Sequence, residues 1–258
     1  MKYIVSFLKR INSFKRKYSF NYLKTIVINF RLLPFKDAFH LPIIIYGSAE
    51  LKIRRSKLII IGKKQFGMLV LGRNDDVFVP TSSKSLFLIL DSNVVIKGFV
   101  RVSPGSVIRL DHTTIELGNN VVFGGGCKIL SNRYIRIGHD TRFAFGCIVC
   151  DTDYHYIEHN GVIKNCTGEI NIGDYCWIGN NTTIAKHTLL PNWTIVGSKS
   201  LVSKNFSEYG EYLLIAGMPA DIKKNKCKKI VDISFEKELK LWFQDSNSAA
   251  YVISSKCK

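Results

Sequence analysis

The side chains best suited to chemistry are grouped in one short stretch, Asp151-Thr152-Asp153-Tyr154-His155. Imidazole titrates near neutral pH, so a histidine here can accept a proton from a hydroxyl that is becoming a nucleophile. A carboxylate bonded to one ring nitrogen would fix the tautomer and leave the other nitrogen free to act as base. Asp151 and Asp153 are near enough in sequence for this role. The alternative for either carboxylate is to accept backbone hydrogen bonds in the turns of the loop.

The elements that must position this stretch are predicted by a repeat of six residues. From residue 172 an aliphatic residue is followed by a small one at every sixth place: Ile172-Gly173, Ile178-Gly179, Ile184-Ala185, Leu190-Pro191, Val196-Gly197 and Val202-Ser203. Neither the 3.6-residue period of a helix nor the 2-residue period of a strand gives this pattern, and a short repeat indicates a solenoid. The repeat extends back, more faintly, to Ile96.

The repeat is interrupted beside the candidate chemistry. From Val149 to Ile172 the interval is 23 residues, where three hexads would take 18. A coil must therefore push out a loop of extra chain, over about residues 151–171. Functional groups are commonly carried by irregular loops on rigid frames.

These repeats resemble the hexapeptide repeats of the left-handed parallel β-helix acyltransferases, over roughly residues 94–205. The resemblance implies an all-β fold, a triangular prism with one hexapeptide per side. The aliphatic residue would point inward, and the small residue would let the chain turn a corner without a Cβ clash. The implied left-handed winding is an exception to the usual right-handed crossover.

Two stretches are similar to the paired motif of sugar O-acetyltransferases: the one ending at His155, and Ile172-Gly173-Asp174-Tyr175-Cys176-Trp177-Ile178-Gly179. In those relatives the matching histidine is the catalytic base, and the matching tryptophan lines the pocket where acceptor and thioester meet. The resemblance therefore implies His155 as base, oriented by Asp153 or Asp151, with Trp177 and Tyr154 at the acceptor. Because Ile178 takes the inward place, Trp177 should face out of the prism.

Donor binding follows from the same resemblance, which implies acetyl-CoA in a groove between the parallel prisms of a homotrimer. The stretches 196–204 and 217–220 resemble the family's glycine-containing coil, basic residue and Gly-x-Pro-Ala turn. The donor residues so implied are Ala185, Ser198, Lys199, Lys204 and Pro219. A lysine suits phosphate as a point charge, although each lysine has the alternative of being an ordinary surface residue.

The net charge of +17 over 258 residues suggests a nucleic-acid, membrane or phosphorylated partner. No zinc-finger spacing, arginine-rich recognition helix or aromatic RNA-binding signature is present, so we do not expect nucleic acid. Residues 1–35 hold no acid and have apolar residues at helical spacing from Ile4 to Phe14. They predict an amphipathic segment that contacts an anionic membrane, or a basic helix that covers the end of the solenoid. Neither a cleaved signal peptide nor a membrane span is expected.

The seven cysteines give no metal prediction. Cys147 and Cys150 have the spacing of a metal or redox pair, but Cys127, Cys147 and Cys176 each lie four places after a hexad's aliphatic residue, where the repeat takes small side chains. We expect reduced thiols in a cytoplasmic protein. Some hexapeptide proteins are zinc carbonic anhydrases; here His155 and His159 could supply two ligands, with no evident third.

The predicted organisation has three parts. Residues 1–40 form the basic amphipathic segment, 41–205 the β-helix, and 206–258 a turn, a short helix over 235–243 and a tail. The resemblance implies acetyl transfer from acetyl-CoA to a hydroxyl of a sugar or surface-glycan precursor, without an acyl-enzyme. Residues 28–38 also resemble the start of capsule and lipopolysaccharide O-acetyltransferases, which suits the inner face of the cytoplasmic membrane. The alternatives are an N-acetyltransferase on an amino sugar and a non-catalytic scaffold.

Overall fold

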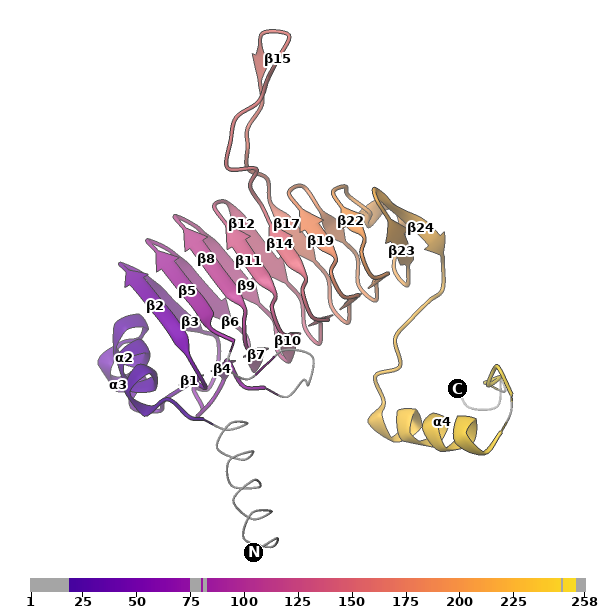
Figure 1. The fold of residues 1–258 in the computed structure, drawn as a ribbon, viewed down its shortest axis with the longest axis horizontal. Coiled ribbons are helices and arrows are strands. Elements are labelled where there is room, and N and C mark those ends of the chain that lie inside the picture. Colours follow the sequence, from indigo (N-terminus) through magenta and orange to yellow (C-terminus); the bar gives the residue numbers. More distant parts are fainter. Residues whose placement is uncertain (1–18, 75–79, 81–82, 247, 254–258) are drawn as a thin grey trace, which may run out of the picture.

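The computed structural model describes residues 19–74, 80, 83–246 and 248–253. The chain winds through three sheets in turn, so that each coil adds one strand to each sheet (Figure 1). The first sheet contains β1 (Ile43–Ile45), β4 (Leu69–Leu71), β7 (Val100–Val102), β10 (Val121–Phe123), β13 (Arg142–Phe143), β18 (Trp177–Ile178), β21 (Ile195–Val196), β23 (Leu214–Gly217) and β24 (Ala220–Lys224).

The other two sides of the prism have the same construction. The second sheet contains β2 (Ala49–Arg54), β5 (Ser85–Leu90), β8 (Val107–Asp111), β11 (Lys128–Ser131), β14 (Ile148–Cys150), β19 (Thr183–Ala185) and β22 (Leu201–Val202). The third contains β3 (Lys57–Ile60), β6 (Asn93–Ile96), β9 (Thr114–Leu117), β12 (Tyr134–Ile137), β17 (Ile170–Ile172) and β20 (Leu189–Leu190). Neighbours pair in parallel, except that β24 runs antiparallel to β23. The predicted fold, a left-handed parallel β-helix, is confirmed.

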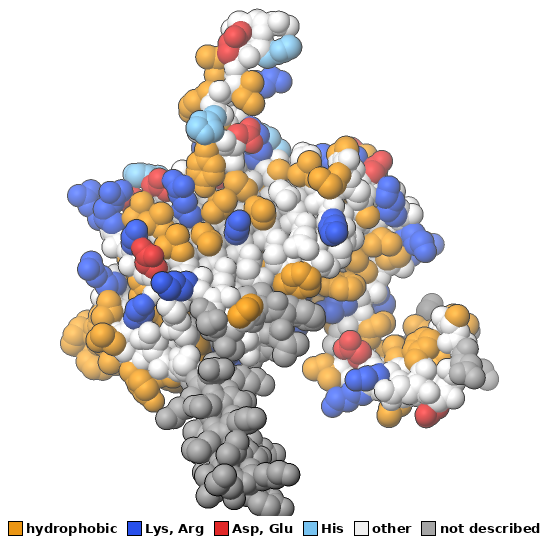
Figure 2. All heavy atoms as spheres, in the orientation of Figure 1, with side chains coloured by type: hydrophobic (Ala, Val, Ile, Leu, Met, Phe, Trp, Pro, Cys, Tyr) orange, Lys and Arg blue, Asp and Glu red, His pale blue; other side chains and the backbone are white. Residues whose placement is uncertain are grey.

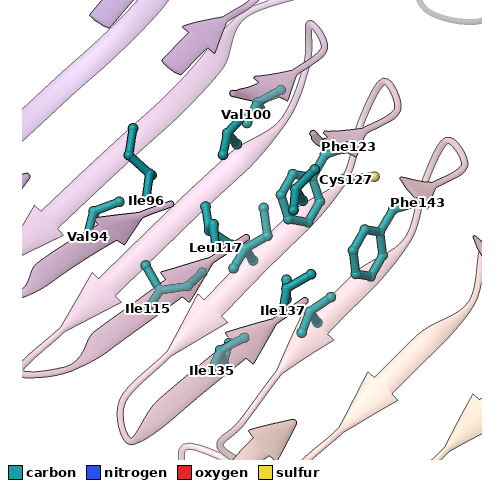
Figure 3. Close-up of a cluster of buried hydrophobic side chains, with 14 of the residues drawn as sticks. Val94, Ile96, Val100, Ile115, Leu117, Phe123, Cys127, Ile135, Ile137 and Phe143 are labelled. Atoms are coloured by element: carbon teal, nitrogen blue, oxygen red, sulfur yellow. The ribbon is translucent and has the colours of Figure 1, made fainter. Parts of the chain in front are cut away.

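The core is a stack of identical inward positions. Ile178, Ile184 and Val202 are fully buried, as the hexad pattern predicts. Aliphatic side chains from successive coils point into the interior and lie over one another (Figure 3). The rings of Phe123 and Phe143 stack in the same way, with centroids 4.7 Å apart. Burial of this continuous apolar column is the main stabilising term of the prism.

The small residues at the corners are required by the adjacent coil. A Cβ added to Gly138 would lie 2.5 Å from the carbonyl carbon of Gly173, and one added to Gly173 would lie 2.7 Å from the amide of Asn192. Contact between stacked backbones therefore excludes a side chain here. Small side chains four places after the inward residues complete the corners; among them, Thr188 and Ser200 each donate a hydroxyl hydrogen bond to a carbonyl three residues earlier, at 2.7 Å.

The first coil is covered by α2 (Tyr22–Leu32), with α3 (Phe35–Ala38) following it. Ile28 and Leu32 of α2 are buried, and the Asn29 side chain bonds both the carbonyl and the amide of Ile43, at 2.7 and 3.0 Å. A helix that covers the end of the solenoid is thus present. The predicted amphipathic pattern from Ile4 to Phe14 lies outside the described residues.

The C-terminal part extends the prism before leaving it. Phe206, Leu213 and Ile215 are buried in the common core, so a further coil follows the regular repeats, with a short 3₁₀ helix η1 (Ser207–Tyr209) in it. The predicted C-terminal helix is α4 (Ile233–Asp245), which has no buried residue. Its Trp242 ring packs against Tyr251, with centroids 5.1 Å apart.

Candidate active site

The stretch that ends at His155 begins a hairpin that stands out from the prism (Figure 1). After β14 the chain forms two short antiparallel strands, β15 (Glu158–His159) and β16 (Val162–Ile163), and returns to the coil at β17. The base is closed by Asp153 donating its amide to the carbonyl of Cys166 at 2.8 Å. The hairpin is thus anchored at its base, while the side chains of both its strands are exposed.

Asp151 is placed inside the prism corner. Its carboxylate is fully buried and accepts hydrogen bonds from four groups of the preceding coil, the backbone amides of residues 132–134 at 2.8–3.0 Å and the Ser131 hydroxyl at 2.5 Å. Asp151 thus satisfies backbone donors, as in the structural alternative, but the donors belong to the preceding coil and not to the turns of the loop. Asp151 therefore fixes where the hairpin leaves the prism.

Asp153 lies at the hairpin base and pairs with a lysine of the next coil. The Lys186 ammonium is 2.6 Å from its carboxylate and donates to the carbonyl of Asn165 at 3.1 Å. Lys186 thus joins both arms of the hairpin to the residue after β19. Sequence reasoning missed Lys186, because an isolated lysine at a repeat corner gives no signal of its own.

A cavity of about 620 Å³ lies along the hairpin, from its base to its turn. It is lined by side chains of the hairpin and by Lys186: Asp153, His155, Ile157, His159, Asn160, Val162, Lys164, Asn165, Cys166 and Lys186. A space of this size accommodates a small organic molecule. The structure therefore brings His155, Asp153 and His159 to one cavity.

His155 is exposed and forms no hydrogen bond or ion pair with any other residue that the structure describes. Asp153 forms an ion pair with Lys186. Its predicted contact with the His155 ring is not formed in this single chain. Both ring nitrogens are consequently available to a bound molecule. An imidazole with a free nitrogen at a cavity wall can act as a base or a hydrogen-bond partner.

Tyr154 turns away from the cavity. Its backbone lies in the left-handed region, with a φ of 61°, and its ring lies beneath the Arg109 guanidinium, 5.0 Å from the ring centroid. Partial burial raises the pKa of the Tyr154 hydroxyl. Tyr154, predicted to contact the acceptor, is therefore not among the residues that line the cavity.

Trp177 faces out of the prism, with 44% of its surface exposed. It lies on β18 of the first sheet, paired with Arg142 and Ile195, whereas the hairpin leaves between β14 of the second sheet and β17 of the third. A single chain therefore presents Trp177 and His155 on different parts of the prism.

The residues predicted for the donor gather at the late coils. Lys204 pairs with Asp221 at 3.1 Å, next to the turn that contains Pro219, and the Gly217 amide donates to the Ser200 hydroxyl at 3.1 Å. The pKa of the Asp221 carboxyl is lowered by the Ile222 amide and by Lys204.

The remaining residues predicted for the donor lie on the outer surface beside these. Ser198 bonds the Asn180 side chain at 2.6 Å, and Lys199 is exposed with a φ of 57°. Ala185, also predicted for the donor, ends β19 directly before Lys186, which lines the cavity.

In the part of the chain that the structure describes, no group of three His, Cys, Asp or Glu side chains is arranged to hold a metal ion. No described helix has both the length and the apolar character needed to cross a bilayer.

No protein-family model matches the chain. It is similar to the polysialic acid-specific acetyltransferase NeuO, at 20% identity over 80% of this chain and 94% of that one, with a TM-score of 0.47. It is also similar to the polysialic acid O-acetyltransferase OatWY, at 21% identity over 76% and 97%, with a TM-score of 0.43. AntD, an N-acyltransferase from Bacillus cereus solved with dTDP and 3-hydroxybutyryl-CoA, matches at 16% identity over 80% and 89%, with a TM-score of 0.39. These similarities assign no role to any residue of the site.

Proposed function

We propose that this chain is an acyltransferase that moves acetyl from acetyl-CoA to a hydroxyl of a sugar or surface-glycan precursor. The observation that carries the proposal is His155, which lines a cavity along an extruded hairpin with both ring nitrogens free of described partners. The hexapeptide prism around it and the Asp-x-Asp-x-His stretch support the proposal through their resemblance to sugar O-acetyltransferases.

The reaction needs one proton acceptor and no covalent enzyme intermediate. His155 takes the proton of the acceptor hydroxyl as its oxygen attacks the thioester carbonyl, and the protonated ring then returns a proton to the departing coenzyme A thiolate. Asp153 lines the same cavity and is assigned to orient the ring. Asp151 acts only by positioning, because its carboxylate is bonded within the prism corner.

The donor is assigned to the late coils. Acetyl-CoA would lie along Ala185, Ser198, Lys199 and the turn at Pro219, and a phosphate would replace Asp221 as the partner of Lys204. Because Trp177 lies on another part of the prism from His155, the proposed acceptor pocket needs Trp177 from a neighbouring copy. A homotrimer of parallel prisms supplies that arrangement and is part of the proposal.

The charge of the cavity favours an acceptor that bears a carboxylate or phosphate. Asp153 and Lys186 neutralise each other across 2.6 Å. Lys164 lines the same cavity and pairs with no acid among the described residues. With His155 and His159 also present, the cavity carries no uncompensated negative charge and attracts anions.

The test is release of free coenzyme A thiol from acetyl-CoA, with neutral, anionic and amino sugars as acceptors. We expect acceptor-dependent release that falls about 10²–10⁴-fold in His155→Ala, the usual contribution of a general base. His112→Ala is the matched control, since His112 is an exposed histidine outside the cavity, and its activity should equal that of the unmodified chain.

Two outcomes would count against the proposal. Unchanged transfer in His155→Ala would remove this residue from the mechanism. Absence of release, together with no coenzyme A binding by calorimetry, would favour a non-catalytic scaffold. Product analysis separates O-acetyl from N-acetyl transfer, because an amide survives mild base that cleaves an ester.

A further inference from the structure

The end of the prism that α2 and α3 cover has an apolar outer surface. Seven large apolar side chains of these helices and their flanks are 39–73% exposed, and we call them the terminal apolar patch: Tyr22, Leu23, Ile26, Val27, Phe30, Phe35 and Phe39. Figure 2 shows hydrophobic side chains gathered at this end, with lysine and arginine beside them.

Packing among the residues that the structure describes does not account for the terminal apolar patch. The opposite face of α2, with Ile28 and Leu32, already covers the first coil. Phe30, Phe35 and Phe39 contact one another, with ring centroids 4.9–5.5 Å apart, and remain exposed. An apolar surface on both sides of a short helix is expected when the outer side has a partner.

The charge around the patch indicates which partner. In the described residues 19–36 the charged side chains are Lys24, Arg31 and Lys36, and none is acidic. Arg31 and Lys36, within α2 and α3, are exposed, and the first acid of the chain, Asp37, is paired with Lys64 at 3.2 Å. Apolar side chains set among uncompensated positive charges match the interface of an anionic bilayer.

We propose that the terminal apolar patch is a peripheral docking surface for an anionic lipid membrane. Phe35 and Phe39 enter the headgroup region, while Arg31 and Lys36 meet lipid phosphates. A second copy fits less well, because an isologous contact would place Arg31 and Lys36 of both copies against each other. The inference does not depend on the reaction proposed for His155.

Vesicle sedimentation of the full chain tests the proposal, with phosphatidylcholine alone and with phosphatidylcholine containing phosphatidylglycerol. We expect binding to the anionic vesicles and little to the neutral ones. Phe35→Ser with Phe39→Ser should lower the partition coefficient about tenfold or more, since two exposed aromatic rings are lost from the lipid contact. Arg31→Gln with Lys36→Gln should weaken binding to anionic vesicles and leave the neutral ones unaffected.

The matched control is Ile233→Ser with Phe243→Ser on α4, where two apolar side chains are 67% and 44% exposed. This variant should bind like the unmodified chain. Equal binding by the phenylalanine variant, or loss confined to the α4 variant, would overturn the proposal. A change of oligomeric state in the phenylalanine variant without a change in vesicle binding would assign the patch to self-association instead. Circular dichroism and thermal unfolding confirm that each variant folds.

Discussion

The prism and the hairpin that leaves it are built on opposite principles. In the prism, each inward residue is covered by the coils above and below, as with Ile178 and Ile184, which are fully buried. In the hairpin, the residues of β15 and β16 are all exposed, and Ile157 and Ile163 keep 69% and 63% of their surface. The coils therefore supply the stability, and the hairpin is free to carry the side chains of the proposed reaction.

The boundary between the prism and the hairpin spans only a few residues, and the two aspartates on it have different surroundings. Asp151 belongs to the prism, because its carboxylate is buried and four times hydrogen-bonded. Asp153, two residues on, belongs to the hairpin, because its partner Lys186 reaches it across the surface. The two aspartates of the motif thus have different structural roles. Substitutions of Asp151 and of Asp153 should therefore change the free energy of unfolding by different amounts.

The largest expected effect tests this boundary. Asp151→Ala leaves three part-buried backbone amides without an acceptor, and should lower the free energy of unfolding by about 4 kcal/mol. Asp153→Ala removes a half-exposed ion pair and should cost less than about 1 kcal/mol. Urea denaturation measures both. Similar losses would mean that the boundary is misplaced.

Two glycines give the next comparison. Gly138→Ala puts a Cβ against the next coil and should cost about 3 kcal/mol. Gly161→Ala, at the hairpin tip, meets no atom within 4 Å, and only its φ of 76° opposes alanine, so about 1 kcal/mol is expected. Thermal unfolding measures the loss of stability in each variant. An equal cost at both positions would contradict the view that coil contact, rather than backbone conformation, sets the requirement for glycine in the prism.

A thiol in the core should make the prism sensitive to alkali. Burial raises the pKa of the Cys176 thiol to about 12. The unfolded thiol titrates near pH 8.5, so between that value and 12 the unfolded state has lost a proton that the folded state keeps. The contribution of this thiol to the free energy of unfolding is constant below about pH 8.5 and falls as pH rises, by about 1–2 kcal/mol at pH 10.

Cys176→Thr isolates this contribution, because Thr182 and Thr188 occupy the same place in later hexads. The variant should have nearly the same stability at pH 7 and a smaller loss at pH 10. If chemical denaturation gives parallel pH profiles for both chains, the titrating group lies elsewhere.

The smallest effect concerns the hairpin alone. Lys186→Met removes the link between Asp153 and Asn165, and should raise the KM for acceptor about tenfold, or 1.4 kcal/mol, with a smaller change in kcat. Stability should change by less than about 1 kcal/mol. Hydrogen exchange over residues 152–166 should quicken. Lys237→Met, on exposed α4, is the control, and an equal change in KM there would show that net charge alone is responsible.

The regular part of the fold could be predicted because the hexad repeat indicates, for each residue, whether its side chain points into or out of the prism. The inward place of Ile178 and the outward place of Trp177 follow from the repeat, and both are found. The last coil, with Leu213 and Ile215 in the core, has an irregular spacing and extends beyond the predicted boundary at residue 205.

The site was less predictable, because its contacts join segments that the repeat does not relate. Asp151 and Asp153 look alike in sequence, and only the corner at residues 131–134 distinguishes them. Lys186 is brought to the hairpin by coil stacking, which a local pattern does not reveal. The pairing of Asp153 with Lys186, in place of His155, likewise depends on three-dimensional arrangement.

The reversed direction of β24 affects how readily another chain could add to the end of the first sheet. A stack of parallel coils ends in an unpaired edge strand, a template on which another chain could polymerise. Because β24 returns antiparallel to β23, the first sheet does not end in another parallel rung. Its outer edge also carries Lys223 and Lys224, whose charges discourage strand addition. The reversed strand and its two lysines thus make this end of the first sheet a poor template for the addition of another chain.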